Sequence, residues 1–276
     1  MNNPTWIRDV RTSHGSLVVE ECGSGETPVL LIHGNSSCRG IFQRQLDSPL
    51  SRRRRLVAFD LPGHGQSGDA PDPMRTYTLA GLADAAIELL ERLGISEVVV
   101  LGWSLGGHIG IEMMRRFPGM KGLVITGTPP VRRGGMAEGF VASPRFGLAG
   151  RRSLSDEEAD RFASAIFGEP SEPFLQAAIR RADGRFREIL FQAAGGRDGG
   201  DQRRAVEGSP IPLAVVNGAE DRLINLDYVD SISYANLWEA RCHRLDRAGH
   251  APFWHASLEF NALVERFLID LAEVGA

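Results

Sequence analysis

The sequence predicts an α/β fold in which helices cover both faces of a mostly parallel, doubly wound sheet. Short apolar runs bounded by glycine or proline alternate with helical patterns along most of the chain. These runs are apolar almost throughout, as expected for strands that are buried on both faces. The alternation fails between residues 131 and 209, which predicts a helical insertion between two strands.

The expected strands begin with a hairpin, Thr5–Arg11 and Ser16–Cys22, joined by Ser-His-Gly turn residues. Later apolar runs predict strands at Pro28–Gly34, Arg55–Asp60, Glu97–Gly102, Gly122–Gly127, Pro212–Gly218 and Ala240–Asp246. Apolar residues spaced three and four apart predict helices at Leu79–Leu93, Leu105–Phe117 and Phe260–Leu271. Gly94 and Pro118 are natural stops for the first two of these helices.

The insertion has its own helical patterns, at Asp156–Phe167, Glu172–Ala182 and Phe186–Ala194. It holds seven of the chain's 13 phenylalanines, and flexible linkers do not carry that many aromatic residues. We therefore expect a core made of residues 1–130 and 210–276, and a helical cap made of residues 131–209.

Composition excludes several classes of function. The net charge of −4 over 276 residues gives no basic surface for nucleic acid. Three cysteines without a CxxC pair favour a reducing compartment over a disulfide framework. The N-terminal sequence has no apolar signal-peptide region, and no apolar run is long enough to span a bilayer. We expect a cytoplasmic protein without membrane insertion, whose oligomeric state the sequence leaves open.

The stretch "GWSLGGHIG" places Ser104 in the pattern Gly-x-Ser-x-Gly, between a predicted strand and a predicted helix. That context is typical of a nucleophile elbow, in which a tight turn projects the serine hydroxyl from the edge of the sheet. The helix N-terminus beneath it favours developing negative charge. The alternative is a glycine-rich turn without chemistry, which the flanking strand and helix make a poor explanation.

A nucleophilic serine needs a base and an orienting carboxylate. His250, in "RAGHAPF", follows the last predicted strand, and loops at the carboxyl ends of parallel strands gather on one edge. "NGAED" follows the strand before it, and we favour Asp221 over Glu220 as the acid. We expect His108, on the helix behind Ser104, to point into helix packing.

A developing oxyanion also needs hydrogen-bond donors. The backbone N–H of Leu105, the residue after the serine, is one candidate. The second is Asn35 in "HGNSS", which follows the first buried strand. We expect the preceding His33-Gly34 pair to shape this loop without taking part in the reaction.

Five motifs resemble the α/β-hydrolase superfamily in order and spacing over nearly the whole chain. They are "HGNSS", "DLPGHGQS", "GWSLGG", "NGAED" and "AGHAP". A second set of stretches is similar to the AidH-like N-acyl homoserine lactone lactonases, which are quorum-quenching serine hydrolases. These stretches are "IHGNSS", "GWSLGGHIGIEM", "ITGTPPV", "VVNG", "NLWE" and "AGHAPF". The cap matches these enzymes less closely than the core does.

This resemblance implies hydrolytic opening of the lactone ring of a bacterial signal. It makes Ser104 the nucleophile, His250 the general base and Asp221 the acid, a position where those enzymes can carry glutamate. It also implies an oxyanion hole at Asn35 and Leu105. The other known lactonase type uses a dinuclear metal site with an HxHxDH motif, which this sequence lacks, so we expect no metal and no cofactor.

The expected substrate is a small ester or lactone. Five aromatic residues are candidates to line its pocket: Trp103, Phe140, Phe162, Phe167 and Phe174. For each phenylalanine taken singly, a place in the cap's own core explains the sequence as well.

The same triad also serves carboxylesterases, C–C bond hydrolases and cofactor-free haloperoxidases, so the fold does not choose among them. A hydrolase-like signal receptor with little turnover is a further alternative. Haloalkane dehalogenases and epoxide hydrolases are disfavoured because their nucleophile is aspartate.

Overall fold

The structure, a computed structural model, describes residues 5–142, 144–168, 172–195 and 200–274. The first four and last two residues of the predicted core, and parts of the predicted cap, therefore lie outside the described residues. An eight-stranded sheet forms the centre of the molecule, in the order β1-β2-β4-β3-β5-β6-β7-β8. The pairs β1–β2 and β2–β4 are antiparallel and every later pair is parallel, which confirms the predicted fold class.

The strands are β1 (Thr5–Thr12), β2 (Gly15–Cys22), β3 (Val29–Ile32), β4 (Leu56–Phe59), β5 (Val98–Trp103), β6 (Met120–Thr126), β7 (Leu213–Gly218) and β8 (His243–Leu245). The helices of the described core are α1 (Gln43–Leu46), α2 (Leu50–Arg53), α3 (Pro73–Thr76), α4 (Leu79–Arg92), α5 (Leu105–Met114), α11 (Leu226–Asp230), α12 (Pro252–His255) and α13 (Ser257–Val274). Short 3-10 helices occur at Arg39–Phe42 and Trp238–Ala240.

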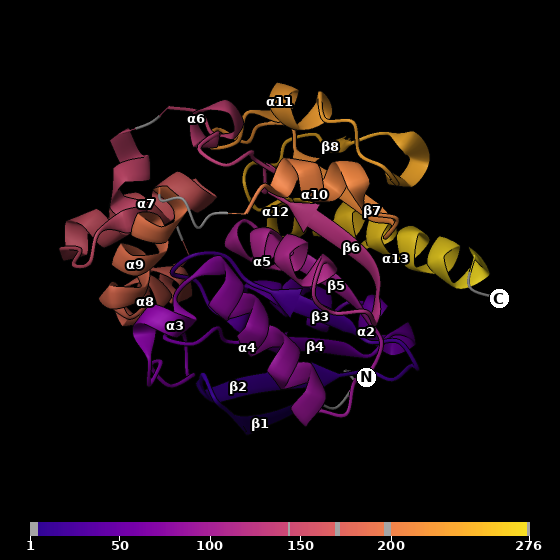
Figure 1. The fold of residues 1–276 in the computed structure, drawn as a ribbon, viewed down its shortest axis with the longest axis horizontal. Helices are drawn as coiled ribbons and strands as arrows, with labels where there is room; N and C mark the ends of the chain where they lie inside the picture. Colours follow the sequence, from indigo (N-terminus) through magenta and orange to yellow (C-terminus); the bar gives the residue numbers. More distant parts are fainter. Residues whose placement is uncertain (1–4, 143, 169–171, 196–199, 275–276) are drawn as a thin grey trace.

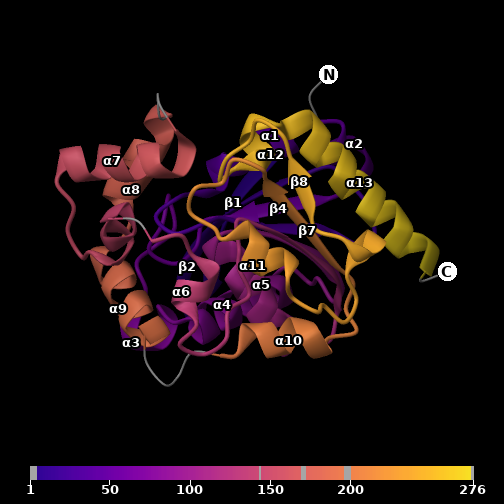
Figure 2. The same cartoon turned by 90° about the horizontal axis from the view of Figure 1, so that it is seen from above.

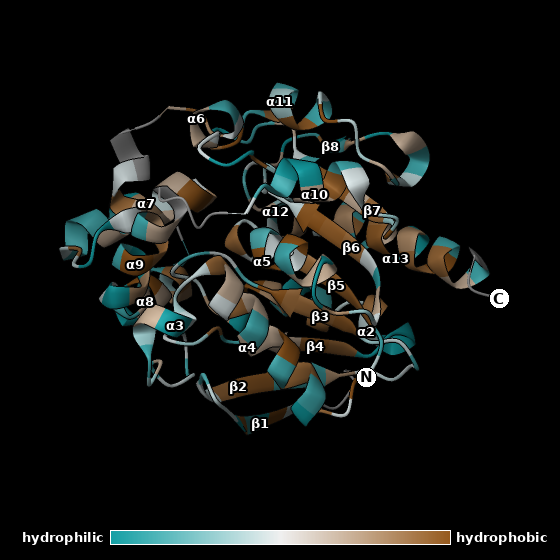
Figure 3. Cartoon of the chain, viewed as in Figure 1, coloured by the Kyte–Doolittle hydropathy of each residue, from teal (hydrophilic) through white to brown (hydrophobic). Residues whose placement is uncertain are grey.

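Two apolar layers sandwich the sheet. Successive residues of β5 point to opposite faces, so Val98 and Val100 pack with α4 and α5 while Val99 and Leu101 pack with α12 and α13. Figures 1 and 2 show α4, α5 and α10 on one face of the sheet and α1, α2, α12 and α13 on the other. The central strands β3, β4 and β5 are strongly hydrophobic along their length (Figure 3), as expected of strands covered on both sides, whereas the edge strand β1 is largely exposed.

Residues 131–209 form no strand in their described part. They contain α6 (Met136–Gly139), a 3-10 helix at Pro144–Gly150, α7 (Asp156–Phe167), α8 (Pro173–Arg181), α9 (Gly184–Gly195) and α10 (Gln202–Gly208). Helices α7, α8 and α9 lie together at one side of the sheet, on the left in Figures 1 and 2. Helix α10 packs instead against α5 on the face of the sheet. We keep residues 131–209 as a proposed cap.

Candidate active site

Ser104 occupies a strained turn between β5 and α5. Its backbone dihedral angles are φ 53° and ψ −117°, a region that side chains other than glycine rarely adopt. A side chain at Gly102 would place its Cβ 2.3 Å from the carbonyl oxygen of Gly106, and one at Gly106 would lie 1.9 Å from that of Ile32. The two flanking glycines therefore let the helix approach β3 and β5 closely enough to hold the turn.

His250 and Asp221 meet at the ends of neighbouring strands. His250 lies between β8 and α12, and its Nδ1 donates to Asp221 Oδ2 at 2.8 Å. The other carboxylate oxygen, Oδ1, accepts the backbone N–H groups of Leu223 and Ile224 at 2.8 and 3.2 Å. The imidazole and carboxylate side chains are 6% and 1% exposed. Asp221, and not Glu220, is thus the carboxylate that orients this ring, and Nε2 has no hydrogen-bond partner among the described residues.

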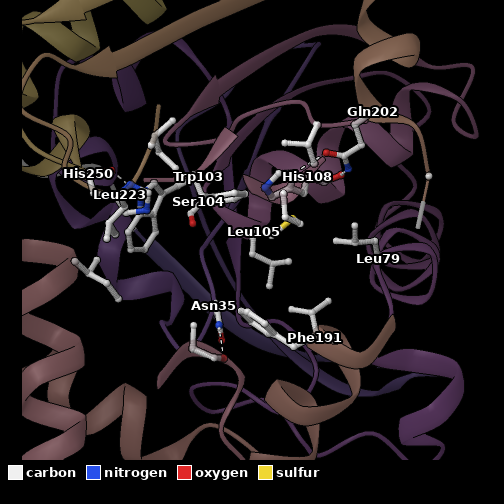
Figure 4. A pocket seen from close by; sticks show the side chains of 18 of the residues that line it. Asn35, Leu79, Trp103, Ser104, Leu105, His108, Phe191, Gln202, Leu223 and His250 are labelled. Carbon is white, nitrogen blue, oxygen red and sulfur yellow. Dashed lines mark hydrogen bonds between the residues drawn. The ribbon is translucent and has the colours of Figure 1, made fainter. Parts of the chain in front are cut away.

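Trp103 precedes Ser104 and contacts His250. Its indole Nε1 donates to the backbone oxygen of His250 at 2.9 Å, and the indole and imidazole rings lie 5.6 Å apart. Ser104 and His250 line the same cavity (Figure 4). Among the described residues, no hydrogen bond joins Ser104 Oγ to the imidazole. Such contacts are often long in unliganded enzymes and shorten when substrate binds.

The loop after β3 lies directly beside Ser104. A Cβ added to Gly34 would come within 3.2 Å of the Ser104 Cβ, and Asn35 lines the cavity. The Asn35 side chain donates to the backbone oxygen of Ala149 at 3.0 Å. Leu105 is the first residue of α5, where a helix leaves its backbone N–H groups without intrahelical partners. Both predicted oxyanion residues are therefore adjacent to the serine.

The cavity beside Ser104 has a volume of ≈ 150 Å³ and is largely apolar. Trp103, Phe140 and Phe162 line it. Phe167 and Phe174 do not, so the prediction that they line the pocket is wrong. Phe167 packs edge-on against Trp103 at 6.0 Å, and Phe174 stacks near Trp254 at 5.4 Å. Both side chains also belong to one aromatic cluster, because Phe167 contacts Trp254 as well.

A family model described as "Alpha/beta hydrolase family" matches residues 29–263. The chain belongs to the alpha/beta hydrolase family. The N-acyl homoserine lactonase AidH, in a structure described as complexed with N-butanoyl homoserine, is 47% identical with a TM-score of 0.93, over 96% of this chain and 97% of that one. A second AidH structure, a serine-to-glycine mutant described as complexed with N-hexanoyl homoserine lactone, is 46% identical with a TM-score of 0.94, over 97% and 98% of the two chains. The predicted resemblance is confirmed.

Curated members of the alpha/beta hydrolase family are more distant in sequence. A 2-hydroxy-6-oxononadienedioate/2-hydroxy-6-oxononatrienedioate hydrolase of a Pseudomonas species is 25% identical, over 92% of each chain. A pimeloyl-[acyl-carrier protein] methyl ester esterase of Methylococcus capsulatus is 29% identical, over 91% of this chain and 98% of that one. Together with the lactonase structures, they indicate that this chain is a hydrolase.

Sequence reasoning missed much of the cavity wall of this hydrolase. His108 packs against a neighbouring helix as expected, where it bonds Gln202 of α10, but it also lines the cavity, which was not predicted. Its position one helical turn after Ser104 was the available signal, since residues four apart share a helix face. The other missed side chains come from several segments: Leu79, Val131, Met136, Leu190, Phe191, Leu223 and Ile224.

Two buried histidines contact the segments around the proposed oxyanion loop, which follows β3 and carries Asn35. His33 Nε2 accepts the backbone N–H of Leu61 at 3.0 Å, and His64 Nε2 accepts that of Ser36 at 3.2 Å. Burial lowers the pKa of His33 and brings that of His64 well below its ordinary value. Both rings are neutral acceptors at neutral pH, consistent with a shaping role for His33.

In the described part of the chain, no three His, Cys, Asp or Glu side chains are grouped as metal ligands.

Proposed function

We propose that this hydrolase opens the lactone ring of N-acyl homoserine lactones. The observation that carries the proposal is the 46–47% identity to AidH over nearly the whole chain, including the proposed cap. The apolar cavity beside Ser104 supports it, because an acyl chain needs an apolar surface. Opening a bacterial signal in this way is quorum quenching.

In the proposed mechanism, Ser104 Oγ attacks the lactone carbonyl while His250 Nε2 takes the hydroxyl proton. Asp221 holds the proton on Nδ1 and stabilises the imidazolium. The backbone N–H groups of Asn35 and Leu105 stabilise the oxyanion. The ring C–O bond then breaks, and His250 returns the proton to the ring oxygen.

The acyl-enzyme retains both halves of the substrate, because the leaving alcohol is still tethered through the opened ring. Water gives a proton to His250 and attacks the Ser104 ester. Collapse of this second intermediate breaks the ester bond, and His250 reprotonates Ser104 Oγ. The product is the N-acyl homoserine acid. Apart from the substrate and water, every group in these steps is a side chain or backbone group of this chain, so the proposed reaction takes no metal and no cofactor.

Product mass tests this proposal. Incubation with N-acyl homoserine lactones of several chain lengths is expected to add one water to each and leave the amide intact, and acid should close the ring again. An acylase would instead release homoserine lactone. Unchanged lactones, with simple aryl esters cleaved by the same preparation, would overturn the lactonase assignment.

A second candidate function is hydrolysis of another small ester or of a C–C bond. The curated relatives favour it, since the two described above are named as a 2-hydroxy-6-oxononadienedioate/2-hydroxy-6-oxononatrienedioate hydrolase and as a methyl ester esterase. Their identities of 25% and 29% are well below that to AidH. A signal receptor built on this fold is distinguished by kinetics, because it would stop after a single turnover.

No helix in the described residues has the length and apolar character needed to cross a membrane.

A further inference from the structure

His108 and Gln202 form a polar pair in the largely apolar wall of the cavity, which Arg132 and Arg133 also line. Gln202 Nε2 donates to the backbone oxygen of His108 at 3.0 Å, and Gln202 Oε1 lies 2.6 Å from His108 Nδ1. Figure 4 shows both side chains on one side of Ser104, with His250 on the other. The mechanism above uses neither residue.

The hydrogen bonds of this pair determine where the imidazole proton is. A backbone carbonyl oxygen can only accept, so the Gln202 atom that contacts it is the NH2 group. The remaining amide atom is an oxygen, which also only accepts, so His108 Nδ1 must carry a proton. Burial lowers the pKa of His108, which keeps the ring neutral. His108 Nε2 is therefore an unprotonated acceptor.

This acceptor, His108 Nε2, has no donor in the described part of the chain. The cavity lining includes the apolar side chains of Leu79, Phe140 and Phe191, as well as Arg132 and Arg133. The ring of Phe140 lies 6.2 Å from the imidazole. A bound ligand that excludes water without offering a donor would leave this lone pair unsatisfied, which weakens binding.

The distance between His108 and the nucleophile indicates which ligand atom it meets. His108 follows Ser104 by one turn, and its backbone N–H bonds the Ser104 carbonyl at 3.3 Å. Side chains four apart start about 6 Å from each other on a helix surface. In an N-acyl homoserine lactone the amide nitrogen is only two bonds from the scissile carbonyl carbon, so it stays beside Ser104. Carbon 3 of the acyl chain is five bonds away and reaches the next turn.

We propose that His108 Nε2 is a specificity-determining acceptor that selects lactones with a hydroxyl group on acyl carbon 3. This inference rests on the proposed function. A 3-hydroxyl donates to Nε2, an unsubstituted chain leaves the lone pair unsatisfied, and a 3-oxo group turns a second acceptor toward it. The expected order of kcat/KM is 3-hydroxy, then unsubstituted, then 3-oxo, with the first step about tenfold.

The test compares N-hexanoyl, N-3-hydroxyhexanoyl and N-3-oxohexanoyl homoserine lactones, which differ only at that carbon. The preference for the 3-hydroxy lactone is expected in the wild type. It should be lost in His108→Leu, which replaces the acceptor by an apolar side chain of similar length. Leu79→Ala is the matched control, because it changes the same wall without changing an acceptor. A pure packing effect would alter kcat/KM for all three lactones by one factor.

A wild-type ratio near one between the hydroxylated and unsubstituted lactones overturns the inference, as does a preference retained in His108→Leu. If none of the lactones is opened, the proposed function fails, and ¹⁵N NMR of His108 tests the acceptor separately. A neutral ring protonated on Nδ1 is then expected. A proton on Nε2 would remove the basis of the inference even if His108→Leu did not fold.

Discussion

Asp221 controls the protonation pattern of His250 because neither of its carboxylate oxygens is free to change partner. Oδ1 accepts two backbone N–H groups, from Leu223 and Ile224, while Oδ2 accepts His250 Nδ1. A backbone N–H can only donate, so an oxygen must always face it. The turn after β7 thus sets the orientation of this side chain independently of the imidazole.

This geometry predicts a large loss for Asp221→Asn. The amide oxygen is expected to stay on the backbone N–H groups, which turns the NH2 toward His250 Nδ1 and forces the proton onto Nε2. With the base blocked, we expect kcat to fall about 10⁴-fold with the fold retained. Steady-state kinetics and circular dichroism check it. Asp221→Glu is the control, since a carboxylate can still accept from the ring, and an Asn variant as active as Glu would contradict the account.

At the scale of elements, α9 is tied to the oxyanion loop through Arg187. The guanidinium is buried and donates to Ser36 Oγ at 3.1 Å, while its other bonds go to backbone oxygens of Arg151, Arg152 and Ile179. Ser36 Oγ in turn donates to Asn35 Oδ1 at 2.9 Å. One side chain of the proposed cap therefore helps to fix the loop that carries the proposed oxyanion donor Asn35.

Arg187→Leu is expected to weaken both folding and catalysis. It leaves buried oxygens without donors, so we expect the free energy of unfolding to fall by about 2 kcal/mol or more. Release of the loop should lower kcat about tenfold, less than loss of a whole oxyanion donor. Urea unfolding and steady-state kinetics measure the two effects. In Arg180→Leu, which removes exposed pairs with Asp156 and Asp160, both quantities should hardly change. Equal effects in the two variants would contradict the link.

The elements of the sheet could be predicted from sequence because buried parallel strands leave a strong local signal. All eight expected strands are present, and α7 has the predicted bounds, Asp156–Phe167. The short helices α6 and α10 were missed because so few turns give little periodicity. The direction in which Phe167, Phe174 and His108 point depends on packing between segments distant in sequence. Local patterns do not contain that information.

At the scale of the whole molecule, two neutral histidines, His33 and His64, are buried where the loops after β3 and β4 meet. Their rings lie 5.2 Å apart, and each accepts a backbone N–H that a second ring proton would displace. Burial lowers the pKa of both below the ordinary value of 6.5. Below that pH the unfolded chain binds more protons than the folded one, so stability falls as the pH falls.

Urea unfolding at pH 7.5 and pH 5.5 checks this coupling. We expect the free energy of unfolding to be lower at pH 5.5, by at most about 3 kcal/mol from these two histidines. Burial also lowers the pKa of four further histidines, which add to the decrease: His14, His108, His243 and His255. Burial raises the pKa values of the carboxylates Glu21 and Asp183, but hydrogen bonds with arginine and other partners lower them by more, so the net shift is downward. These carboxylates lose their contribution to stability only below their unfolded pKa values of 4.5 and 3.8. They therefore do not account for a change in this window. Equal or greater stability at pH 5.5 would contradict the neutral histidine pair.

The central claim is that Ser104, held in the strained turn after β5, is the nucleophile that opens a lactone. The most direct measurement is the rate of lactone opening by Ser104→Ala, with circular dichroism and thermal unfolding to show that the fold is retained. Loss of a serine nucleophile costs about 10⁶-fold in kcat in a comparable triad, and we expect a loss of that order here. A folded Ser104→Ala variant that opens lactones at the wild-type rate would contradict the account.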